Sequence, residues 1–336
     1  MRVAVDAMGG DYAPREVVLG ALQAARLGGI EILLVGDPPA LKTGLAAAEV
    51  GEGLPLRLVP AEGVIGEGEP PVQALRQKPR ASIAVAAGLV KQGAADAFVT
   101  MGSTGAAVAA ATMALGLLEG IGRPALGGPV LGLAPDTVLV DLGSQVDCRP
   151  EHLLSFAVLG MAFARTVLGV QEPRVALLTV GTEEGKGTRL VKEAADLLRA
   201  RGLPFAGFVE GHQLPFLRAA QVVVCDGFVG NIVMKLLEGV GSALAEHARR
   251  RLAGLLSPAE AERYDQEVYD LLNVVERAGG GPLFGVNGVA IVGHGRSRAP
   301  AVANAILTAR RAVEVGLVQA MREDLARLRR AQPAGG

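Results

Sequence analysis

Short apolar runs rich in β-branched residues alternate with longer Ala- and Leu-rich stretches along the chain. Most of the short runs are bounded by glycine or proline, which is typical of strands, and the longer stretches have helical spacing. This alternation predicts a mainly parallel, doubly wound α/β sheet with helices on both faces. We expect strands at residues 3–6, 31–36, 56–60, 97–100, 137–141, 174–179, 206–210, 222–225 and 289–292.

Glycine-rich polar loops follow many of the expected strands. In order along the chain they read AMGGD, MGSTGA, LGSQVD, GTEEGKGT, GFVGN and GHGRS, and a further loop, GGGPLFGVNG, precedes the last strand. Ligands of doubly wound sheets bind at the carboxyl ends of the strands. The sequence therefore predicts a phosphate or carboxylate pocket built from several of these loops.

Two helical regions stand apart from this alternation. Residues 242–277 have the pattern of two amphipathic helices, and the second begins with a capping box, Ser257-Pro258-Ala259-Glu260. We expect an inserted helical hairpin at 242–277 within a single large α/β domain of residues 1–336. The hairpin is either a packed subdomain or dimer contact, or a membrane-surface contact made by its basic first helix. A long last helix is expected at 301–331.

Composition narrows the classes of protein. Half of the 336 residues are apolar, which is enough for one large core or two lobes. The net charge of −1 provides no field that would attract nucleic acid. The two cysteines and four histidines are scattered without metal-ligand spacing, so we expect no metal site. Reduced core thiols are typical of a cytosolic protein.

An uncharged segment, residues 97–118, is long enough to span a bilayer. It is rich in small residues, and Gly102-Ser103-Thr104-Gly105 interrupts it. We therefore expect a central strand and a buried helix there instead of a membrane span. Near the N-terminus, Asp6 ends the apolar run too early for a signal peptide, so we expect a cytoplasmic protein.

Two of the loops carry candidate anion-binding groups. Gly102, Ser103, Thr104 and Gly105 offer backbone N–H groups at the start of an expected helix, where negative charge is favoured. Lys186 lies between two glycines and can reach a phosphate as a point charge, although a solvated turn lysine is the ordinary alternative. The P-loop, G-x-G-x-x-G and G-x-S-x-G motifs are absent from these loops, so we expect no nucleotide cofactor.

Acids, amides and one histidine complete the candidates. Asn231 and Asn287 can donate to a developing oxyanion or serve as turn amides. His294 is flanked by two glycines and can act as an acid, a base or an orienting group. Four acids end or follow strands, where the ordinary role of an acid is to cap a helix or a loop: Asp6, Asp11, Asp141 and Asp226.

Long motifs occur in a fixed order from one end of the chain to the other. They are VDAMGGDYAP (5–14), VTMGSTGA (99–106), VLVDLGSQVDCRPEHL (138–153), LLTVGTEEGKGTRLVKEA (177–194), VVVCDGFVGNIVMKLLEG (222–239) and GGGPLFGVNGVAIVGHGRS (279–297). In this order they resemble the acyl-acyl-carrier-protein:phosphate acyltransferase (PlsX) family. That family often has Asn at the position of Ser103 and Ala-Asn at Ser144-Gln145, so an amide role is not carried over to Ser103 or Gln145.

The resemblance implies transfer of a fatty acyl group from carrier-protein phosphopantetheine to inorganic phosphate, which gives acyl phosphate for phospholipid synthesis. It implies no cofactor and a fold similar to phosphotransacetylases and isocitrate/isopropylmalate dehydrogenases. The implied partners are acyl carrier protein, phosphate and a second copy of the chain, and no nucleic acid. Some family members associate peripherally with the membrane, and residues 242–277 are the candidate for such a contact.

The candidate residues can be given roles in this reaction. Residues 102–105 and Lys186 bind phosphate, which is anionic at neutral pH and needs positioning more than a strong base. Asn231 stabilises the oxyanion or orients the thioester, and His294 protonates the leaving sulfur. The other members of the predicted site are Asp6 and Asp11, which hold the turn at Gly9 and Gly10, the loop residues Gly227 and Gly230, and the polar residues Asp226 and Asn287.

Three other functions stay open on the sequence alone. A short-chain phosphotransacylase would use acyl-CoA in place of acyl carrier protein. A decarboxylating dehydrogenase on the same fold would need a metal and a nicotinamide cofactor, and the missing dinucleotide motif disfavours it. A membrane-associated scaffold would bind liposomes without turnover.

Overall fold

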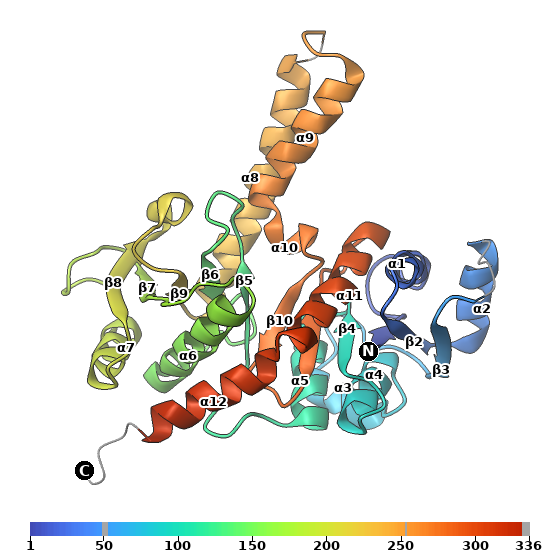
Figure 1. The fold of residues 1–336 in the computed structure, drawn as a ribbon, viewed down its shortest axis with the longest axis horizontal. Coiled ribbons are helices and arrows are strands. Elements are labelled where there is room, and N and C mark those ends of the chain that lie inside the picture. The colour runs from blue at the N-terminus through green and yellow to red at the C-terminus, as the bar shows by residue number, and fades with distance from the viewer. Residues whose placement is uncertain (49–52, 253, 331–336) are drawn as a thin grey trace. The chain divides into compact units, whose positions relative to one another are not determined.

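The computed structural model describes residues 1–48, 53–252 and 254–330. The chain forms two compact units (Figure 1). Unit 1 consists of residues 1–126 and 278–325, and unit 2 of residues 127–277 and 326–330, as far as the chain is described. The single large domain expected from the sequence stays a prediction.

Unit 1 contains a sheet whose strands follow the order β3-β2-β1-β4-β11-β10. The first five are parallel, and β10 runs antiparallel to β11. Ala125 and Leu126, at the start of β5 (Ala125–Pro129), pair with the outer side of β10. The bounds are β1 Arg2–Asp6, β2 Glu31–Gly36, β3 Leu56–Pro60, β4 Ala97–Thr100, β10 Gly281–Phe284 and β11 Val289–Val292.

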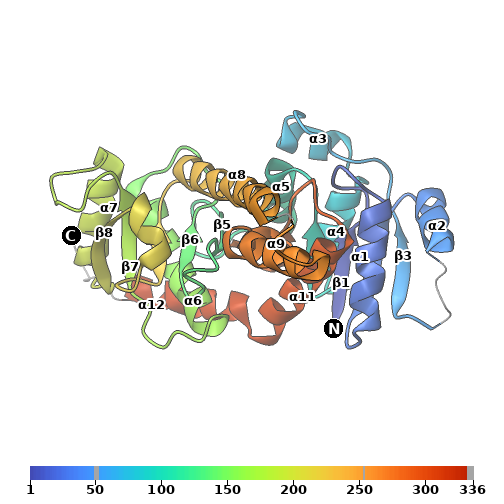
Figure 2. The same cartoon turned by 90° about the horizontal axis from the view of Figure 1, so that it is seen from above.

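Helices cover both faces of this sheet (Figures 1 and 2). The connections β1-α1-β2 and β3-α4-β4 run in opposite directions across the sheet, so right-handed crossovers place α1 and α4 on opposite faces. α11 packs on α1, and α5 packs on α4. The helices are α1 Arg15–Arg26, α2 Pro38–Ala47, α3 Pro71–Gln77, α4 Ser82–Lys91, α5 Thr104–Leu115, α11 Ala299–Glu314 and α12 Leu317–Arg330, the last of which ends in unit 2.

Unit 2 contains strands in the order β5-β6-β9-β7-β8. All neighbours are parallel except β5, which runs antiparallel to β6 through residues 127–129. α6 packs on α7 and against β6 and β9. The bounds are β6 Val138–Val140, β7 Val175–Thr179, β8 Phe205–Glu210, β9 Val222–Val224, α6 Pro150–Thr166, α7 Arg189–Ala200 and the 3₁₀ turn η1 Gly211–Phe216. The mainly parallel, doubly wound architecture predicted from the alternation is therefore confirmed.

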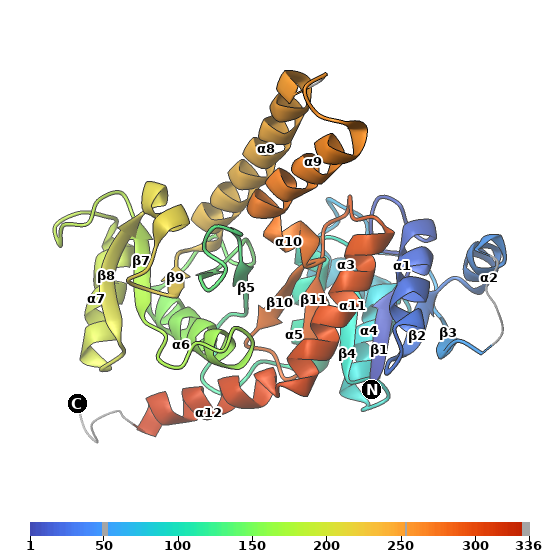
Figure 3. The same ribbon diagram turned by 45° about the horizontal axis from the view of Figure 1, so that its top comes forward.

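Two antiparallel helices, α8 (Gly227–Leu252) and α9 (Pro258–Leu272), form a hairpin in unit 2 (Figure 3). The capping box at its turn is present: the Ser257 side chain accepts from the Glu260 N–H, and Glu260 Oε2 accepts from the Ser257 N–H at 2.9 Å. A short α10 (Val274–Arg277) follows. α8 begins well before residue 242 because the GFVGN loop after β9 is already its first turn. Residue 253, within the expected hairpin, lies outside the described residues.

Three details differ from the sequence expectation. β5 (ALGGP) and β10 (GPLF) are strands, although their glycine and proline content indicates loops. The expected last helix is two helices, because Gly316 between α11 and α12 has a φ of +66°. Its expected end, Ala331, lies outside the described residues.

The uncharged segment 97–118 contains β4 and α5, as expected.

Candidate active site

A buried carboxylate joins the loops that follow β1 and β4 in unit 1. Asp6 Oδ2 accepts from the Thr100 hydroxyl at 2.7 Å, and the same hydroxyl oxygen accepts from the Gly102 N–H at 3.0 Å. Asp6 Oδ1 also accepts from the Met8 N–H at 3.3 Å. Burial raises the pKa of the Asp6 carboxyl, against the lowering effect of these hydrogen bonds. Asp6 therefore positions backbone of both loops.

Gly9 and Gly10 let these loops approach each other. A Cβ on Gly9 would lie 2.6 Å from Asp6 Oδ2 and 2.9 Å from the Gly102 nitrogen. Gly10 has a φ of +105°, which favours glycine. The Asp11 N–H donates to the Gly295 carbonyl at 2.8 Å, so the loop after β11 joins the same cluster. The turn predicted to hold backbone close to a ligand thus contacts two neighbouring loops.

The start of α5 faces this cluster. Ser103 caps the helix, because its Oγ accepts from the Ala106 N–H at 3.2 Å. The first N–H groups of a helix have no partner within the helix, and with the helix dipole they favour an anion. Thr104 and Gly105 lie in this first turn. The Ser103 hydroxyl therefore caps the helix, although the family often has the amide of Asn at this position.

A pocket of about 190 Å³ lies in unit 1 between these loops and the segment after β3. Its lining includes Gly9, Gly10, Gly102, Ser103 and Gly295. Residues 64–67, Met8 and Met101 also line the pocket. Of the predicted unit 1 residues, Gly9, Gly10, Asp11, Gly102 and Ser103 line this hollow, whereas Asp6, Thr104, Gly105, Asn287 and His294 are not among its lining residues.

A second buried carboxylate organises the loop after β6 in unit 2. Asp141 is fully buried. Its carboxylate accepts from the N–H groups of Gly143 and Ser144 at 3.1 Å, from that of Gln145 at 2.7 Å and from the Ser144 hydroxyl at 2.7 Å. The sequence predicts a capping role for Asp141, and the structure shows that it holds its own loop. Its sequence signals are an acid at the end of a strand and its place in the motif at 138–153.

The Asp141 loop packs against the first turn of α8. The Gly227 N–H donates to the Gln145 carbonyl at 2.8 Å. A Cβ on Gly230 would lie 1.8 Å from the Asp141 carbonyl oxygen, so only glycine fits there. A Cβ on Gly143 would lie 3.3 Å from the Asn231 side chain. Asn231, which is exposed, therefore lies next to the Asp141 loop.

Asp226 lies directly before α8 and caps it. Its Oδ1 accepts from the Val229 N–H at 2.9 Å. This is the ordinary role of an acid before a helix. A catalytic role for Asp226 stays a prediction.

Lys186 lies in an exposed turn of unit 2 between β7 and α7. Its N–H donates to the Glu183 carbonyl at 2.9 Å, and Gly187 after it has a φ of +89°. Among the described residues, the Lys186 ammonium forms no ion pair. The ammonium is therefore available to an anionic ligand.

His294 and Asn287 lie in different parts of unit 1. His294 follows β11, and its carbonyl accepts from the Ser297 N–H at 2.9 Å, next to the pocket residue Gly295. Asn287 Nδ2 donates to the Leu117 carbonyl at 2.7 Å, beyond the C-terminal end of α5. The structure does not bring Asn287 to the pocket, which lies at the N-terminal end of that helix. A substrate role for Asn287 stays a prediction.

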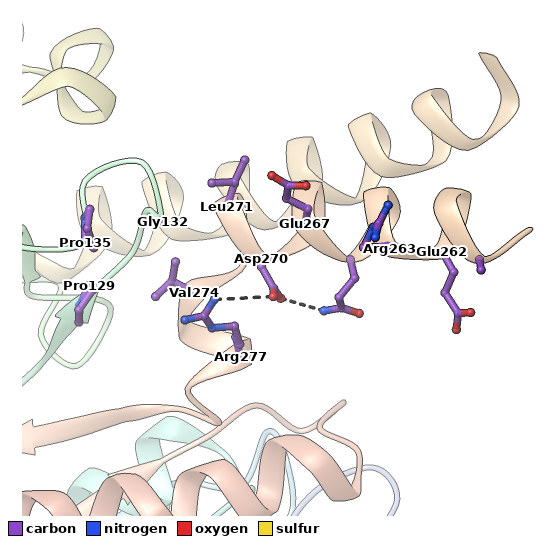
Figure 4. A pocket seen from close by; sticks show the side chains of 12 residues that line it. Pro129, Gly132, Pro135, Glu262, Arg263, Glu267, Asp270, Leu271, Val274 and Arg277 are labelled. Atoms are coloured by element: carbon purple, nitrogen blue, oxygen red, sulfur yellow. Dashed lines mark hydrogen bonds and ion pairs between the residues drawn. The ribbon is translucent and has the colours of Figure 1, made fainter. Parts of the chain in front are cut away.

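A larger hollow of about 850 Å³ lies in unit 2 between residues 129–135 and α9 (Figure 4). Its lining carries charges of both signs, and Asp270 is held by Arg277 at 3.6 Å and by Gln266 at 2.8 Å. None of the predicted site residues lines it. Across the described part of the chain, no group of three or more His, Cys, Asp or Glu residues is arranged to hold a metal.

Comparison with known proteins shows which family the chain resembles. The family model described as "Fatty acid synthesis protein" matches residues 1–320. A phosphate acyltransferase from Desulfitobacterium hafniense (strain DSM 10664 / DCB-2) is 42% identical, with 99% of this chain and 100% of that protein covered. One from Heliobacterium modesticaldum (strain ATCC 51547 / Ice1) is 44% identical, with 97% and 98% covered.

Solved structures of the same fold carry other activities. A phosphotransacetylase from Streptococcus pyogenes is 16% identical, with a TM-score of 0.58 over 97% of this chain and 94% of its own. A 4-hydroxythreonine-4-phosphate dehydrogenase from Klebsiella pneumoniae is 16% identical, with a TM-score of 0.56 over 93% and 99%. Both confirm the fold implied by the motifs. The match over nearly the whole length to curated relatives goes further, and the chain belongs to the phosphate acyltransferase (PlsX) family.

Proposed function

We propose that this protein transfers a fatty acyl group from acyl-acyl-carrier protein to inorganic phosphate, giving acyl phosphate for phospholipid synthesis. The observation that carries the proposal is the similarity to curated phosphate acyltransferases over 99% of the chain. In the reaction a phosphate oxygen attacks the thioester carbonyl, the C–O bond forms and the C–S bond breaks. The electron pair leaves with sulfur, which ends as the free thiol of the carrier protein.

Phosphate is the nucleophile and needs no strong base, because its second pKa is about 6. Lys186 supplies a positive charge for it, and the backbone N–H groups of residues 102–105 are further donors to an anion. The exposure of Lys186 and its lack of an ion pair with the described residues support this role. The capped N-terminus of α5 supports the role of residues 102–105.

The tetrahedral intermediate carries an oxyanion that needs hydrogen-bond donors. Asn231 provides an amide for it, and the loop with Gly227 and Gly230 sets where that amide lies. Removal of one oxyanion donor typically costs about 3 kcal/mol of transition-state stabilisation. The packing of the Asp141 loop on the first turn of α8, through the Gly227 N–H bond to the Gln145 carbonyl, supports this placement of Asn231.

A thiolate leaves readily, so the demand for an acid is modest. His294 is the candidate proton donor to sulfur, and Asp226 is the second polar candidate. Asp6 and Asp11 act on the turn at Gly9 and Gly10, which is supported by the hydrogen bonds of Asp6 to Thr100 and Met8.

We also propose that the protein is a cytoplasmic homodimer with a peripheral membrane contact at residues 242–277. α8 is the one described helix long and apolar enough to cross a membrane by length and composition, and 28% of that stretch is buried. Its exposed apolar side chains recur every four residues, at Phe228, Ile232, Leu236, Val240 and Leu244. We call this row the α8 stripe. An exposed apolar row of this kind indicates an interaction surface, and we propose that a second copy of the chain packs against it.

The decisive experiment measures thiol release from palmitoyl-acyl-carrier protein with and without inorganic phosphate. We expect phosphate-dependent release, and hydroxylamine should trap the acyl phosphate. Release from acetyl-CoA but not from the carrier protein would indicate a short-chain phosphotransacylase. Liposome binding with no release from either donor would indicate a scaffold.

A further inference from the structure

Residues 64–67, after β3, line the unit 1 pocket together with the glycine loops. Ile65 is buried with 4% of its surface exposed, and Val64 is 40% exposed. Met8 and Met101 add further apolar surface. We call residues 64–67 the pocket wall. The hollow is therefore lined by aliphatic residues as well as by the glycine loops.

The charges in this pocket are of one sign. Its charged lining residues are Asp11 and Glu67, and no lysine, arginine or histidine occurs among its described lining residues. Glu67 lies on the wall and Asp11 on the loop after β1, and the Glu67 carboxylate opposes an anion at the wall because like charges repel. An uncharged, partly apolar group meets no such opposition and gains by burying its surface. The wall is thus suited to a neutral alkyl group rather than to the anion.

An ion pair holds the wall in place. Lys78, which follows α3, donates to Glu69 Oε1 and Oε2 at 2.8 and 2.7 Å and to the Val64 carbonyl at 3.2 Å. Glu69 Oε1 also accepts from the Gly66 N–H at 2.7 Å. The main chain on both sides of Ile65 is therefore tied to one lysine and one glutamate. A loop held in this way can present a defined surface to a ligand.

We propose that the pocket wall binds the acyl group of the donor at the carbons next to the thioester. This inference rests on the proposed function and adds a specificity-determining surface to it. The pocket of about 190 Å³ is smaller than the roughly 300–1,000 Å³ typical of sites that enclose a whole drug-sized ligand. It holds only the first part of a fatty acyl chain, and the rest extends beyond it. The wall thus senses that an alkyl chain is present and is insensitive to its full length.

The test is Val64→Ser, with Val72→Ser on α3 as the matched control. Val72 is also exposed, at 48%, and does not line the pocket. Initial rates are measured with octanoyl- and palmitoyl-acyl-carrier protein at varied donor and varied phosphate. We expect Val64→Ser to raise the donor KM roughly fivefold for both chain lengths, since each buried methyl group contributes severalfold. The phosphate KM and the Val72→Ser control should stay within about twofold of wild type.

A second variant tests the same surface through its support. Lys78→Ala removes both bonds to Glu69 and the bond to Val64, and it should raise the donor KM in the same direction. An unchanged donor KM in Val64→Ser, or an equal rise in the phosphate KM, would overturn the acyl site while turnover by wild type still upheld the proposed function. No turnover by wild type with either donor would instead overturn the proposed function, and the acyl site with it.

Discussion

Asp141 is the residue on which the geometry of the unit 2 loops depends most. Its buried carboxylate accepts four hydrogen bonds from its own loop, and that loop packs on the α8 turn before Asn231. In Asp141→Asn an NH₂ group would face N–H donors. We expect a loss of about 2–3 kcal/mol in the free energy of unfolding, because buried donors lose their acceptor. Urea denaturation measures it.

The control for that variant is Asp136→Asn in the same unit, since Asp136 is exposed. It should change the free energy of unfolding by less than about 0.5 kcal/mol. kcat should fall in Asp141→Asn and not in the control, because the Asp141 loop packs on the first turn of α8, where the proposed oxyanion donor Asn231 lies. Equal stability of the two variants would show that the carboxylate is dispensable.

Gly9 is the residue at which the loops after β1 and β4 come closest. A Cβ there would lie 2.6 Å from Asp6 Oδ2 and 2.9 Å from the Gly102 nitrogen, which is backbone and cannot yield easily. We expect Gly9→Ala to lower the free energy of unfolding by about 1–3 kcal/mol. Gly88→Ala on α4 is the opposite case, because no atom lies within 4 Å of its Cβ. Gly88→Ala should raise the free energy of unfolding by up to about 1 kcal/mol. Thermal melts of the two variants test this, and a change of the same sign in both would contradict the prediction.

The structural role of Gly9 can be predicted from the sequence, whereas that of Asp141 cannot. Gly9 stands beside Gly10 between two acids, a pattern that already indicates a tight turn. Asp141 looks the same as Asp226 in the sequence, since each is an acid after a strand. Only the fold shows that Asp226 caps a helix while Asp141 gathers the donors of a whole loop.

At the scale of elements, the pocket wall depends on the ionisation of Glu69. The hydrogen bond from Lys78, and next that from the Gly66 N–H, lower the pKa of Glu69 from its ordinary value of 4.5. A lowered carboxyl pKa stabilises the fold above pH 4.5, and the contribution is lost as pH falls through the lowered pKa. Glu69→Gln should therefore be less stable than wild type near neutral pH, and the difference should vanish in acid. Thermal melts from about pH 3 to pH 7 measure it. A constant difference would exclude the ion pair as its cause.

The elements that the sequence pattern missed share one property. β5 and β10 are antiparallel strands of glycine- and proline-containing sequence, and their pairing with each other joins segments far apart in the chain. Local pattern carries no information about such pairing. The central parallel strands such as β2 and β4 are predictable because they are continuous, largely buried apolar runs.

At the scale of the whole molecule, alternation of strands and helices was enough to give the doubly wound class, and motif order was enough to give the family. Neither gives the division into two units, because Gly127 and Ala278, where the chain crosses between units, carry no linker composition. Each unit presents its own glycine loops after parallel strands. This repetition explains why the candidate residues are spread over the whole sequence.

The α8 stripe leads to a prediction about assembly. Its members, from Phe228 to Leu244, are exposed at four-residue spacing along one helix, and Leu236 near the middle is 63% exposed. If a second copy covers the stripe, Leu236→Glu places an unpaired charge in an apolar interface, which costs several kcal/mol. We expect at least an approximately 100-fold weaker dimer. Sedimentation velocity across a concentration series measures it, with Leu27→Glu as the control because Leu27 is 65% exposed in unit 1. A monomeric wild type, or equal association of both variants, would show that a second copy does not cover the stripe.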